Sequence, residues 1–338
     1  MDAVSDVLRV VRLSGAVYLN GEFTAPWCVL GEADAALCEA FLPRTERVVS
    51  FHLVTEGSCW ARLADDPMSA IHLTAGELLV VPQGESHIMA SVLDMSPVQV
   101  GPLLAAQLET APRQVIRLSY GGGGTGTRLV CGFLACNDLL SNPLISALPR
   151  IFKVDMRNDP RSAWLDASLQ FAAAEAADWR AGSELILARL SELLFVEAVR
   201  RCIDGLPADK KGWLAGVRDR FVGRALSMMH AQPAHDWTVD ELARSAGLSR
   251  SALAQRFTDL LGQPPMQYLA HWRLQIAAQE LLTGGKSVAA VAEHVGYESE
   301  AAFNRAFKRE FGQPPAGWRR CRGKGAAPVP AAERSGLA

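Results

Sequence analysis

Long apolar runs are missing from this chain of 338 residues: none approaches the roughly 18 residues that a transmembrane helix needs. The first residues, MDAVSDVLRVVRL, mix acidic residues with apolar ones and lack the continuous apolar segment of a signal peptide. These two absences predict a cytoplasmic protein with no membrane partner.

Cysteine is present but is not arranged for disulfide or zinc chemistry. The seven cysteines are an odd number at irregular spacing, and no two of them form a Cys-x-x-Cys pair. This distribution argues against a disulfide scaffold and a zinc knuckle, and it favours a reducing compartment. Cys131 and Cys136 lie five positions apart on an expected strand, so their side chains should point to opposite faces of a sheet. We interpret them as small buried side chains, with oxidant sensing as the alternative.

Motifs of common catalytic sites are also missing. There is no Gly-x-Ser-x-Gly motif, and the glycine run at 121–128 lacks the Gly-Lys-Ser/Thr ending of a phosphate-binding loop. We interpret that run as a loop that leads into a strand. The sequence therefore predicts no enzyme activity, no catalytic residue and no cofactor.

The formal charge is small and unevenly distributed. Residues 1–220 hold 20 Lys and Arg against 26 Asp and Glu, whereas residues 221–323 hold 12 against 9. The balance changes from −6 to +3 between these segments. A positive C-terminal part is compatible with a polyanionic partner.

The C-terminal part contains a duplicated segment. Gly-Gln-Pro-Pro occurs at 262–265 and again at 312–315, and the residues before each copy also correspond, with Gly247 matching Gly296. Each copy has the pattern of a short helix, a glycine turn and a second helix with a serine cap, over about 238–261 and 287–311. This order predicts a helix-turn-helix unit in each copy.

The second helix of each unit carries the side chains that we expect to contact DNA. Arg, Gln and Asn recognise base edges in the major groove through paired hydrogen bonds, and Lys and Arg contact phosphates. A long helix between the units, closed by Gly284 and Gly285, would hold them at a fixed separation. An all-helical interaction module is the alternative. The expected DNA-binding residues are Arg250, Ser251, Ala254, Gln255 and Arg256 in the first unit and Glu300, Ala301, Asn304, Arg305, Lys308 and Arg309 in the second.

The N-terminal two thirds have a different pattern. Residues 45–100 alternate short apolar stretches with Gly, Pro and acidic residues, which is typical of an antiparallel β-barrel or sandwich. Helical periodicity follows from Trp164 to Ile203, where Gly182 separates two expected helices and Ser183 caps the second. That second helix has an apolar stripe wide enough to pack on the barrel or to pair with another copy of the chain.

Both parts of the chain resemble known protein families. The segments LARSAGLSRSALAQRF and VAAVAEHVGYESEAAFNRAFKREFGQPP are similar to the DNA-binding domain of AraC-type transcriptional regulators. The segment GELLVVPQGESH resembles the second motif of the cupin barrel, and FHLVTEG keeps part of the first. Together with VYLNGEFTAPWCV and TRLVCGFLAC, these stretches resemble the cupin-like sensory domain of one subgroup of AraC-type regulators.

The resemblance implies an α+β multidomain fold. A cupin-like antiparallel β-barrel with dimerisation helices is expected at 1–204, and a linker region at 205–220. An all-α DNA-binding domain with two helix-turn-helix units joined by a long helix is expected at 221–322, followed by a disordered tail at 323–338.

The same resemblance implies a function in transcription. Arg305 would recognise a base, and Ser251, Ala254 and Gln255 would occupy the variable recognition positions. The implied partners are double-stranded promoter DNA, a second copy of the chain, an unknown small-molecule effector, and RNA polymerase if the protein is an activator.

Side chains of the N-terminal part are candidates for ligand sensing. The resemblance places His52 and His87, with His72 as a further candidate, near the positions of cupin metal ligands. Two or three histidines are an incomplete ligand set, so we expect core histidines and no metal site. The ligand-sensing candidates are His52, His87, Cys131 and Cys136. The alternatives are a metal-dependent cupin enzyme and an oxidant or metal sensor, each with an attached DNA-binding domain.

Overall fold

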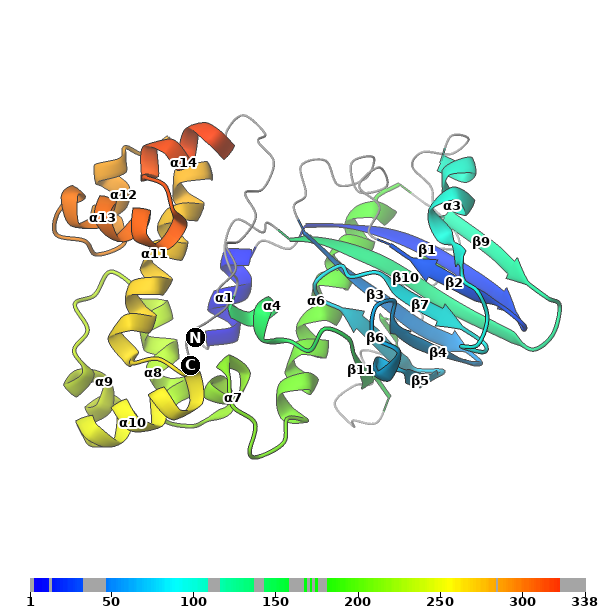
Figure 1. Ribbon diagram of the computed structural model, residues 1–338, viewed down its shortest axis with the longest axis horizontal. Coiled ribbons are helices and arrows are strands. Elements are labelled where there is room, and N and C mark those ends of the chain that lie inside the picture. The colour runs from blue at the N-terminus through cyan, green and yellow to red at the C-terminus, as the bar shows by residue number, and fades with distance from the viewer. Residues whose placement is uncertain are drawn as a thin grey trace.

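The computed structural model describes residues 3–11, 14–32, 47–108, 116–136, 143–157, 167–168, 171, 174–175, 181–283 and 285–322. A β domain occupies one end of the molecule and a helical domain the other, with α1 (Ala3–Val11) and α4 (Pro143–Ala147) between them (Figure 1). The expected tail at 323–338 and most of the first expected helix before Gly182 lie outside the described residues. No helix in the described ranges has the length and apolar character needed to cross a membrane.

The β domain consists of two sheets with a shared apolar core. One sheet has six strands in the order β11-β6-β3-β10-β1-β9, and the other has five in the order β5-β4-β7-β2-β8. Neighbouring strands are antiparallel, except that β1 is parallel to β9 and β2 is parallel to β8. This arrangement confirms the predicted cupin-like domain. The strands are β1 (Ser14–Thr24), β2 (Cys28–Gly31), β3 (Arg47–Glu56), β4 (Ser58–Leu63), β5 (Ile71–Thr74), β6 (Glu77–Val81), β7 (His87–Ala90), β8 (Val98–Gln99), β9 (Ile116–Gly121), β10 (Gly126–Cys136) and β11 (Phe152–Asp155).

Buried and exposed side chains alternate along the strands, and the buried ones form the core between the sheets. Leu19 and Phe23 of β1 are buried, whereas Glu22 between them is exposed, as the period of two along a strand requires. Phe23 stacks on the fully buried Trp27 with ring centroids 4.4 Å apart. Short helices at Pro67–Ser69 (η1) and Val100–Leu108 (α3) connect strands.

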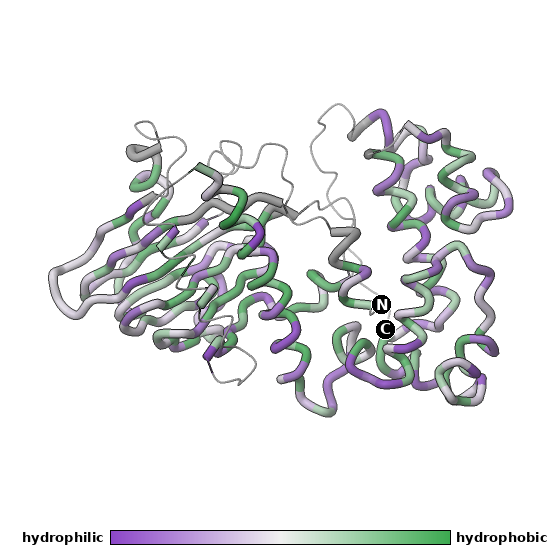
Figure 2. The backbone as a smooth tube through the Cα atoms, turned by 180° about the vertical axis from the view of Figure 1, so that it is seen from behind, coloured by the Kyte–Doolittle hydropathy of each residue, from purple (hydrophilic) through white to green (hydrophobic). Residues whose placement is uncertain are grey.

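Helix α6 (Ser183–Asp204) packs against the six-stranded sheet over β1 and β10. Its buried side chains include Leu194 and Val199, and hydrophobic and hydrophilic residues alternate along it (Figure 2). The prediction that Ser183 caps this helix is wrong. The N-cap is Gly182 at φ 92°, and the Ser183 hydroxyl instead donates a hydrogen bond to the carboxylate of Glu175.

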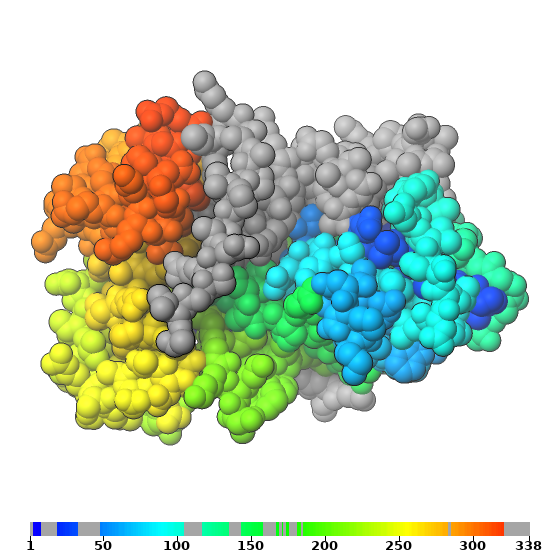
Figure 3. Space-filling view, viewed as in Figure 1, coloured from blue at the N-terminus to red at the C-terminus, as the bar shows by residue number. Residues whose placement is uncertain are grey.

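The helical domain consists of two lobes. In Figure 3 the lobe that contains α12 to α14 lies above the lobe that contains α8 to α10. The range expected as a linker contains α7, and Trp213 and Leu214 of that helix are buried. The helices are α7 (Trp213–Arg218), α8 (Val222–Ala231), α9 (Val239–Ala246), α10 (Arg250–Leu261), α11 (Pro265–Thr283), α12 (Val288–His294), α13 (Glu300–Phe311) and α14 (Pro315–Arg322).

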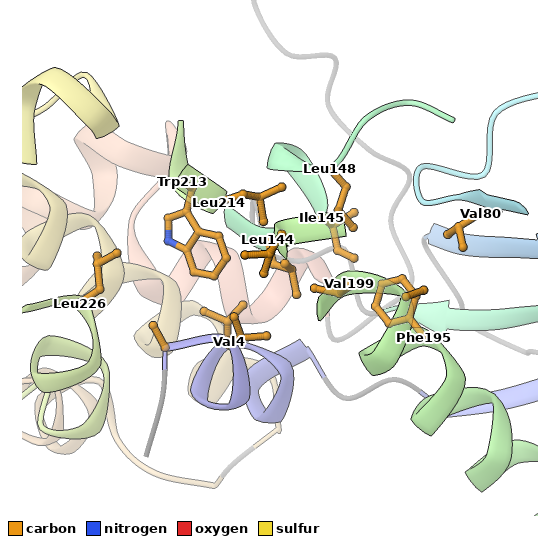
Figure 4. Packing of buried hydrophobic residues seen from close by; sticks show 14 of the residues in the cluster. Val4, Val80, Leu144, Ile145, Leu148, Phe195, Val199, Trp213, Leu214 and Leu226 are labelled. Atoms are coloured by element: carbon orange, nitrogen blue, oxygen red, sulfur yellow. The ribbon is translucent and has the colours of Figure 1, made fainter. Parts of the chain in front are cut away.

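One apolar core continues from the β domain into the helical domain (Figure 4). It contains Val4 of α1, Leu144 of α4, Val199 of α6, Trp213 of α7 and Leu226 of α8. Burial of such side chains is the main favourable term in packing. The two domains therefore have a shared hydrophobic interface in addition to the covalent connection.

Candidate nucleic-acid interface

The first helix-turn-helix unit forms through local capping. The Thr238 hydroxyl accepts a hydrogen bond from the backbone N–H of Glu241 at 3.2 Å, which fixes the start of α9. Gly247 ends that helix with φ 81°, a conformation that favours glycine. The Ser249 hydroxyl then accepts from the backbone N–H of Ala252 at 3.3 Å and starts α10. The predicted order of cap, turn and cap is confirmed.

The second unit repeats this construction. The Ser287 hydroxyl accepts from the backbone N–H of Ala290 at 3.1 Å, and the Ser299 hydroxyl accepts from the backbone N–H of Ala302 at 3.2 Å. Gly296, between the two helices, has φ 84°. Equivalent residues therefore make equivalent contacts, and the predicted duplication is confirmed in three dimensions.

The two Gly-Gln-Pro-Pro segments each end one helix and start the next. Gly262 and Gly312 end α10 and α13 with φ 73° and 75°. Pro265 and Pro315 are the first residues of α11 and α14. Proline suits the first helical turn because its φ is already helical and its missing N–H would have no partner there. The sequence predicted the helix ends but not that the proline pair also begins α14.

Arg273 of α11 holds the two units in a fixed relation. Its guanidinium donates to the carbonyl oxygens of Pro233 at 2.6 Å and His235 at 2.8 Å, in the segment before the first unit. It also donates to the carbonyl oxygen of Gly296 at 3.2 Å, in the turn of the second unit. The connecting helix α11 has 19 residues, which makes it about 28 Å long. One turn of duplex is about 34 Å, so this connection is of the right scale for two successive major grooves.

The residues predicted to contact DNA from the first unit lie on the accessible side of α10. Three of them contact acidic side chains, and Arg256 is described below. Of the other two, Arg250 lies 3.6 Å from Asp240, and the Gln255 amide donates to Asp259 at 2.7 Å. Ala254 is half-buried, whereas the others are exposed: Arg250, Ser251, Gln255 and Arg256.

Arg256 is bound to the protein itself. Its Nε donates to Oδ2 of Asp219 at 2.9 Å, and Nη2 donates to the same oxygen. The other carboxylate oxygen of Asp219 accepts from the backbone N–H groups of Phe221 and Val222 at 3.0 Å, at the start of α8. Asp219 therefore ties the first recognition helix to α8.

Replacing Asp219 with alanine is expected to lower the free energy of unfolding by about 2 kcal/mol, because two backbone donors and one guanidinium lose their acceptor. Burial raises the pKa of Asp219, but the hydrogen bonds from Arg256, Val222 and Phe221 outweigh it and hold the pKa below its usual value. The stabilisation is therefore present above about pH 4 and is lost as the pH falls further.

Urea denaturation at pH 7 and pH 3 measures this effect. Asp219→Asn is the matched control, because it keeps an acceptor for the backbone N–H groups while it removes the charge, and it should cost less than Asp219→Ala. Equal stability of the parent chain and Asp219→Ala at pH 7 would refute the assignment.

The predicted residues of α13 have fewer partners. Within the part of the chain that the structure describes, no ion pair engages Arg305 or Lys308. Both side chains are exposed, so they can meet phosphates or bases without breaking an internal contact. Asn304 is half-buried, and the remaining predicted residues of this helix are exposed: Glu300, Ala301 and Arg309.

His52 and His87 meet between the two sheets, one from β3 and one from β7. Their Nε2 atoms are 2.7 Å apart, and Nδ1 of His87 lies 2.9 Å from the carbonyl oxygen of Glu85. The carbonyl requires a proton on His87 Nδ1, so His87 Nε2 is the acceptor and His52 Nε2 donates. Nδ1 of His52 is buried without a partner.

Both imidazoles are held neutral. Burial, and secondly the neighbouring His87, keep the pKa of His52 well below its usual range. Burial also lowers the pKa of His87, against the opposing effect of the Glu85 carbonyl. His72 is exposed and lies against Trp60 with ring centroids 4.8 Å apart. Among the described residues, no three His, Cys, Asp or Glu side chains form a group that could hold a metal ion.

Cys131 lies beside His52 on the neighbouring strand β10 and is buried. Burial, and secondly the nearby Cys59, raise the pKa of the Cys131 thiol far above its usual value. Since the thiolate is the reactive form, Cys131 is poorly suited to oxidation in this conformation. Cys136 ends β10, and its side chain lies outside the described part of the chain.

A cupin-like β domain joined to two capped helix-turn-helix units defines the class of two-domain transcriptional regulators. A cupin family model matches residues 2–204, and a helix-turn-helix domain model matches residues 242–321. A putative AraC-like transcription regulator of Streptomyces lividans is 31% identical over 326 residues, which cover 95% of this chain and 98% of the relative. The chain therefore belongs to the family of AraC-like transcriptional regulators.

The chain is also similar to a second relative and to a solved DNA-binding domain. The RCS-specific HTH-type transcriptional activator RclR of Escherichia coli is 28% identical over 319 residues, which cover 94% of this chain and 97% of RclR. The solved DNA-binding domain of AdpA in complex with a target DNA matches 31% of this chain and 96% of its own length, at 30% identity and a TM-score of 0.30.

Proposed function

We propose that this AraC-like regulator is a cytoplasmic homodimer that activates transcription from specific promoters in response to a signal sensed by its cupin-like domain. The observation that carries the proposal is the pair of capped recognition helices, α10 and α13, which α11 and Arg273 hold in one arrangement. Similarity to a protein named as a transcriptional activator supports activation, which would require contact with RNA polymerase. We assign the chain no enzymatic role.

The second unit contributes most of the sequence recognition in this proposal. Arg305 and Lys308 are exposed and have no ion-pair partner among the described residues, whereas Arg250 and Arg256 of the first unit lie against Asp240 and Asp219. A free guanidinium can form the paired hydrogen bonds that recognise guanine. A guanidinium held by a carboxylate has to leave that partner first.

Replacing Arg305 with alanine is expected to weaken operator binding by about 2 kcal/mol, roughly 30-fold, and to relax the preference at one base pair. Lys308→Ala should weaken binding similarly for all sequences, since phosphate contacts do not distinguish bases. Gel-shift titrations on an operator selected from genomic fragments, and on its single-base variants, measure both effects. Unchanged affinity and selectivity of Arg305→Ala would refute the assignment of this residue.

The proposed dimer would use the outer face of α6. Three large apolar side chains of this helix are exposed, Leu185 by 64%, Leu193 by 51% and Ile186 by 40%. Exposed apolar patches of this kind mark interaction surfaces. A face of this kind on each of two copies can form a two-fold interface.

Replacing Leu193 with lysine is expected to raise the dimer dissociation constant at least tenfold, because a charge would be desolvated in the interface. Sedimentation equilibrium measures the constant. Met68→Lys is the matched control, since Met68 is 92% exposed on η1 and should leave association unchanged. A dimer equally stable in both variants would place the interface elsewhere.

A further inference from the structure

The two lobes of the helical domain are joined by α11 but have separate apolar cores. In Figure 1, α11 runs from the lobe that contains α8 to α10 into the lobe that contains α12 to α14. Trp272 of α11 belongs to the core of the first lobe, whereas Leu274 belongs to the core of the second. The half-buried Ile276 packs against both cores. Most of the apolar packing therefore lies within a lobe and leaves the angle between the lobes to other contacts.

Arg273 lies between these two cores and bridges the lobes. Its Nε and Nη2 donate to the carbonyl oxygens of Pro233 at 2.6 Å and His235 at 2.8 Å, before the first unit. Its Nη1 donates to the carbonyl oxygen of Gly296 at 3.2 Å, in the turn of the second unit. Each guanidinium nitrogen therefore has its own acceptor, two in one lobe and one in the other. Because a guanidinium is planar and rigid, these bonds fix the direction between the lobes as well as the distance.

Both acceptor segments are themselves held in place. The buried Trp237 indole donates to the carbonyl oxygen of Gln232 at 3.0 Å, which closes the segment between α8 and α9. The backbone N–H of Tyr297 donates to a carbonyl oxygen of α12 at 2.9 Å, which closes the turn between α12 and α13. The two segments also touch, since a Cβ on Gly296 would lie 2.7 Å from the carbonyl oxygen of Ala234. The guanidinium therefore connects two ordered segments that already lie in contact.

We propose that Arg273 is a positioning residue that sets the spacing and the rotational phase of the two DNA half-sites bound by α10 and α13 of one chain. The inference rests on the proposed function and deepens it by naming what selects the operator spacing. One base pair inserted between the half-sites moves the second half-site by about 3.4 Å and turns it by about 34° about the duplex axis. Lobes held at one angle cannot follow that rotation, whereas lobes joined only by a helix have more freedom to follow it. When the geometry forbids simultaneous contact with both half-sites, the gain from linking the two units is lost.

The same contacts should raise the affinity at the correct spacing. Because the lobes are already in the binding arrangement, less ordering is needed when they meet DNA. Removing the guanidinium should therefore weaken binding at the preferred spacing and also reduce the penalty at other spacings. A residue that only stabilised the fold would lower the affinity at every spacing by the same factor. The dependence of affinity on spacing separates these two roles.

The test compares three forms of one operator with the full chain. The operator is selected from genomic fragments, and footprinting locates the two half-sites of one chain. One base pair is then inserted or deleted between them. We expect the parent to bind both altered forms about 30-fold more weakly than the selected form. For Arg273→Met we expect about tenfold weaker binding of the selected form, and a penalty of only about threefold for the altered forms. Gel-shift titrations measure all these affinities.

Arg319→Met is the matched control. Arg319 is half-buried and donates to the carbonyl oxygens of Leu281 at 3.2 Å and Lys286 at 2.6 Å, both on the side of the second lobe. It makes the same kind of contact without bridging the lobes, so Arg319→Met should keep the spacing penalty of the parent. Arg273→Lys is the milder variant, because a single ammonium keeps the charge but cannot span three acceptors. It should also show a reduced spacing penalty, and it gives the comparison if Arg273→Met does not fold.

Two results would overturn the inference. One is a spacing penalty in the Arg273 variants that equals the penalty in the parent and in Arg319→Met. The other is a parent that binds all three forms of the operator with the same affinity. A parent that binds DNA but shows either result leaves the proposed function intact, whereas a parent that selects no operator at all refutes the proposed function itself.

Discussion

Replacing Gly296 with alanine is expected to destabilise the second helix-turn-helix unit by about 3 kcal/mol. Gly296 has φ 84°, where an L-residue costs about 1–2 kcal/mol. A Cβ atom at this position would also lie 2.7 Å from the carbonyl oxygen and 2.8 Å from the Cα of Ala234. Both are backbone atoms, so the segment before the first unit would have to move.

The duplication supplies a matched control. Gly247 is the equivalent residue of the first unit and has nearly the same φ, 81°, but no described atom lies within 4 Å of a Cβ placed there. Gly247→Ala should therefore cost only the conformational term, about 1 kcal/mol. Urea denaturation of the two variants measures the difference. Equal destabilisation would show that the Gly296 turn can move away from Ala234 freely.

Gly296→Ala should also weaken operator binding by more than its effect on stability explains. The Gly296 carbonyl is one of the acceptors of Arg273, and the other two, on Pro233 and His235, flank Ala234. Displacing Ala234 therefore disturbs the contacts that fix one unit against the other. Gel-shift titrations at a temperature where both variants are folded separate this effect from unfolding.

The helix-turn-helix units were predictable because their signals are local. Thr238, Gly247 and Ser249 act on backbone groups within a few residues of themselves, and their counterparts in the second unit do the same. Capping residues start helices, and glycines in the left-handed conformation end them, in most sequence contexts. The exposure of Arg305 followed from the helical period alone.

Contacts between distant residues were not predictable in this way. Arg256 has a typical position for a phosphate contact, yet its carboxylate partner Asp219 lies 37 residues earlier. Asp219 precedes the apolar pattern of α8 by a few residues, which is a signal for a helix cap but not for an ion pair. The Arg273 contacts and the shared core of α1, α4 and α7 likewise depend on tertiary packing.

The cupin motifs drew attention to His52 and His87 but did not indicate how the two side chains are related in space. His52 and His87 lie 35 residues apart on different sheets, and only the packing of those sheets brings their Nε2 atoms together. In the folded chain both stay neutral because burial disfavours the charged form. In the unfolded chain each would gain a proton near pH 6.5.

Lowering the pH is therefore expected to destabilise the β domain through this pair. The unfolded state binds protons that the folded pair does not bind, so the free energy of unfolding falls as the pH drops below about 6.5. For each histidine the loss between pH 7.5 and 5.5 has an upper limit of about 1.4 kcal/mol, reached when the folded state takes up no proton at pH 5.5. His52, whose pKa lies well below its usual range, comes nearer to this limit than His87. His52→Leu/His87→Leu removes both groups and should show a correspondingly smaller loss.

Urea denaturation of the parent chain and the double variant at the two pH values isolates the pair. The other histidines are common to both chains, including His230, whose pKa burial lowers to about 4. Their contributions cancel in the difference between the chains, as do the ion pairs that His235 and His294 make with glutamates. The difference in free energy of unfolding between the parent and the variant could be the same at pH 7.5 and 5.5. That result would mean that the folded pair accepts protons as readily as the unfolded chain. The assignment of His52 and His87 as a neutral, directly hydrogen-bonded pair would then be wrong.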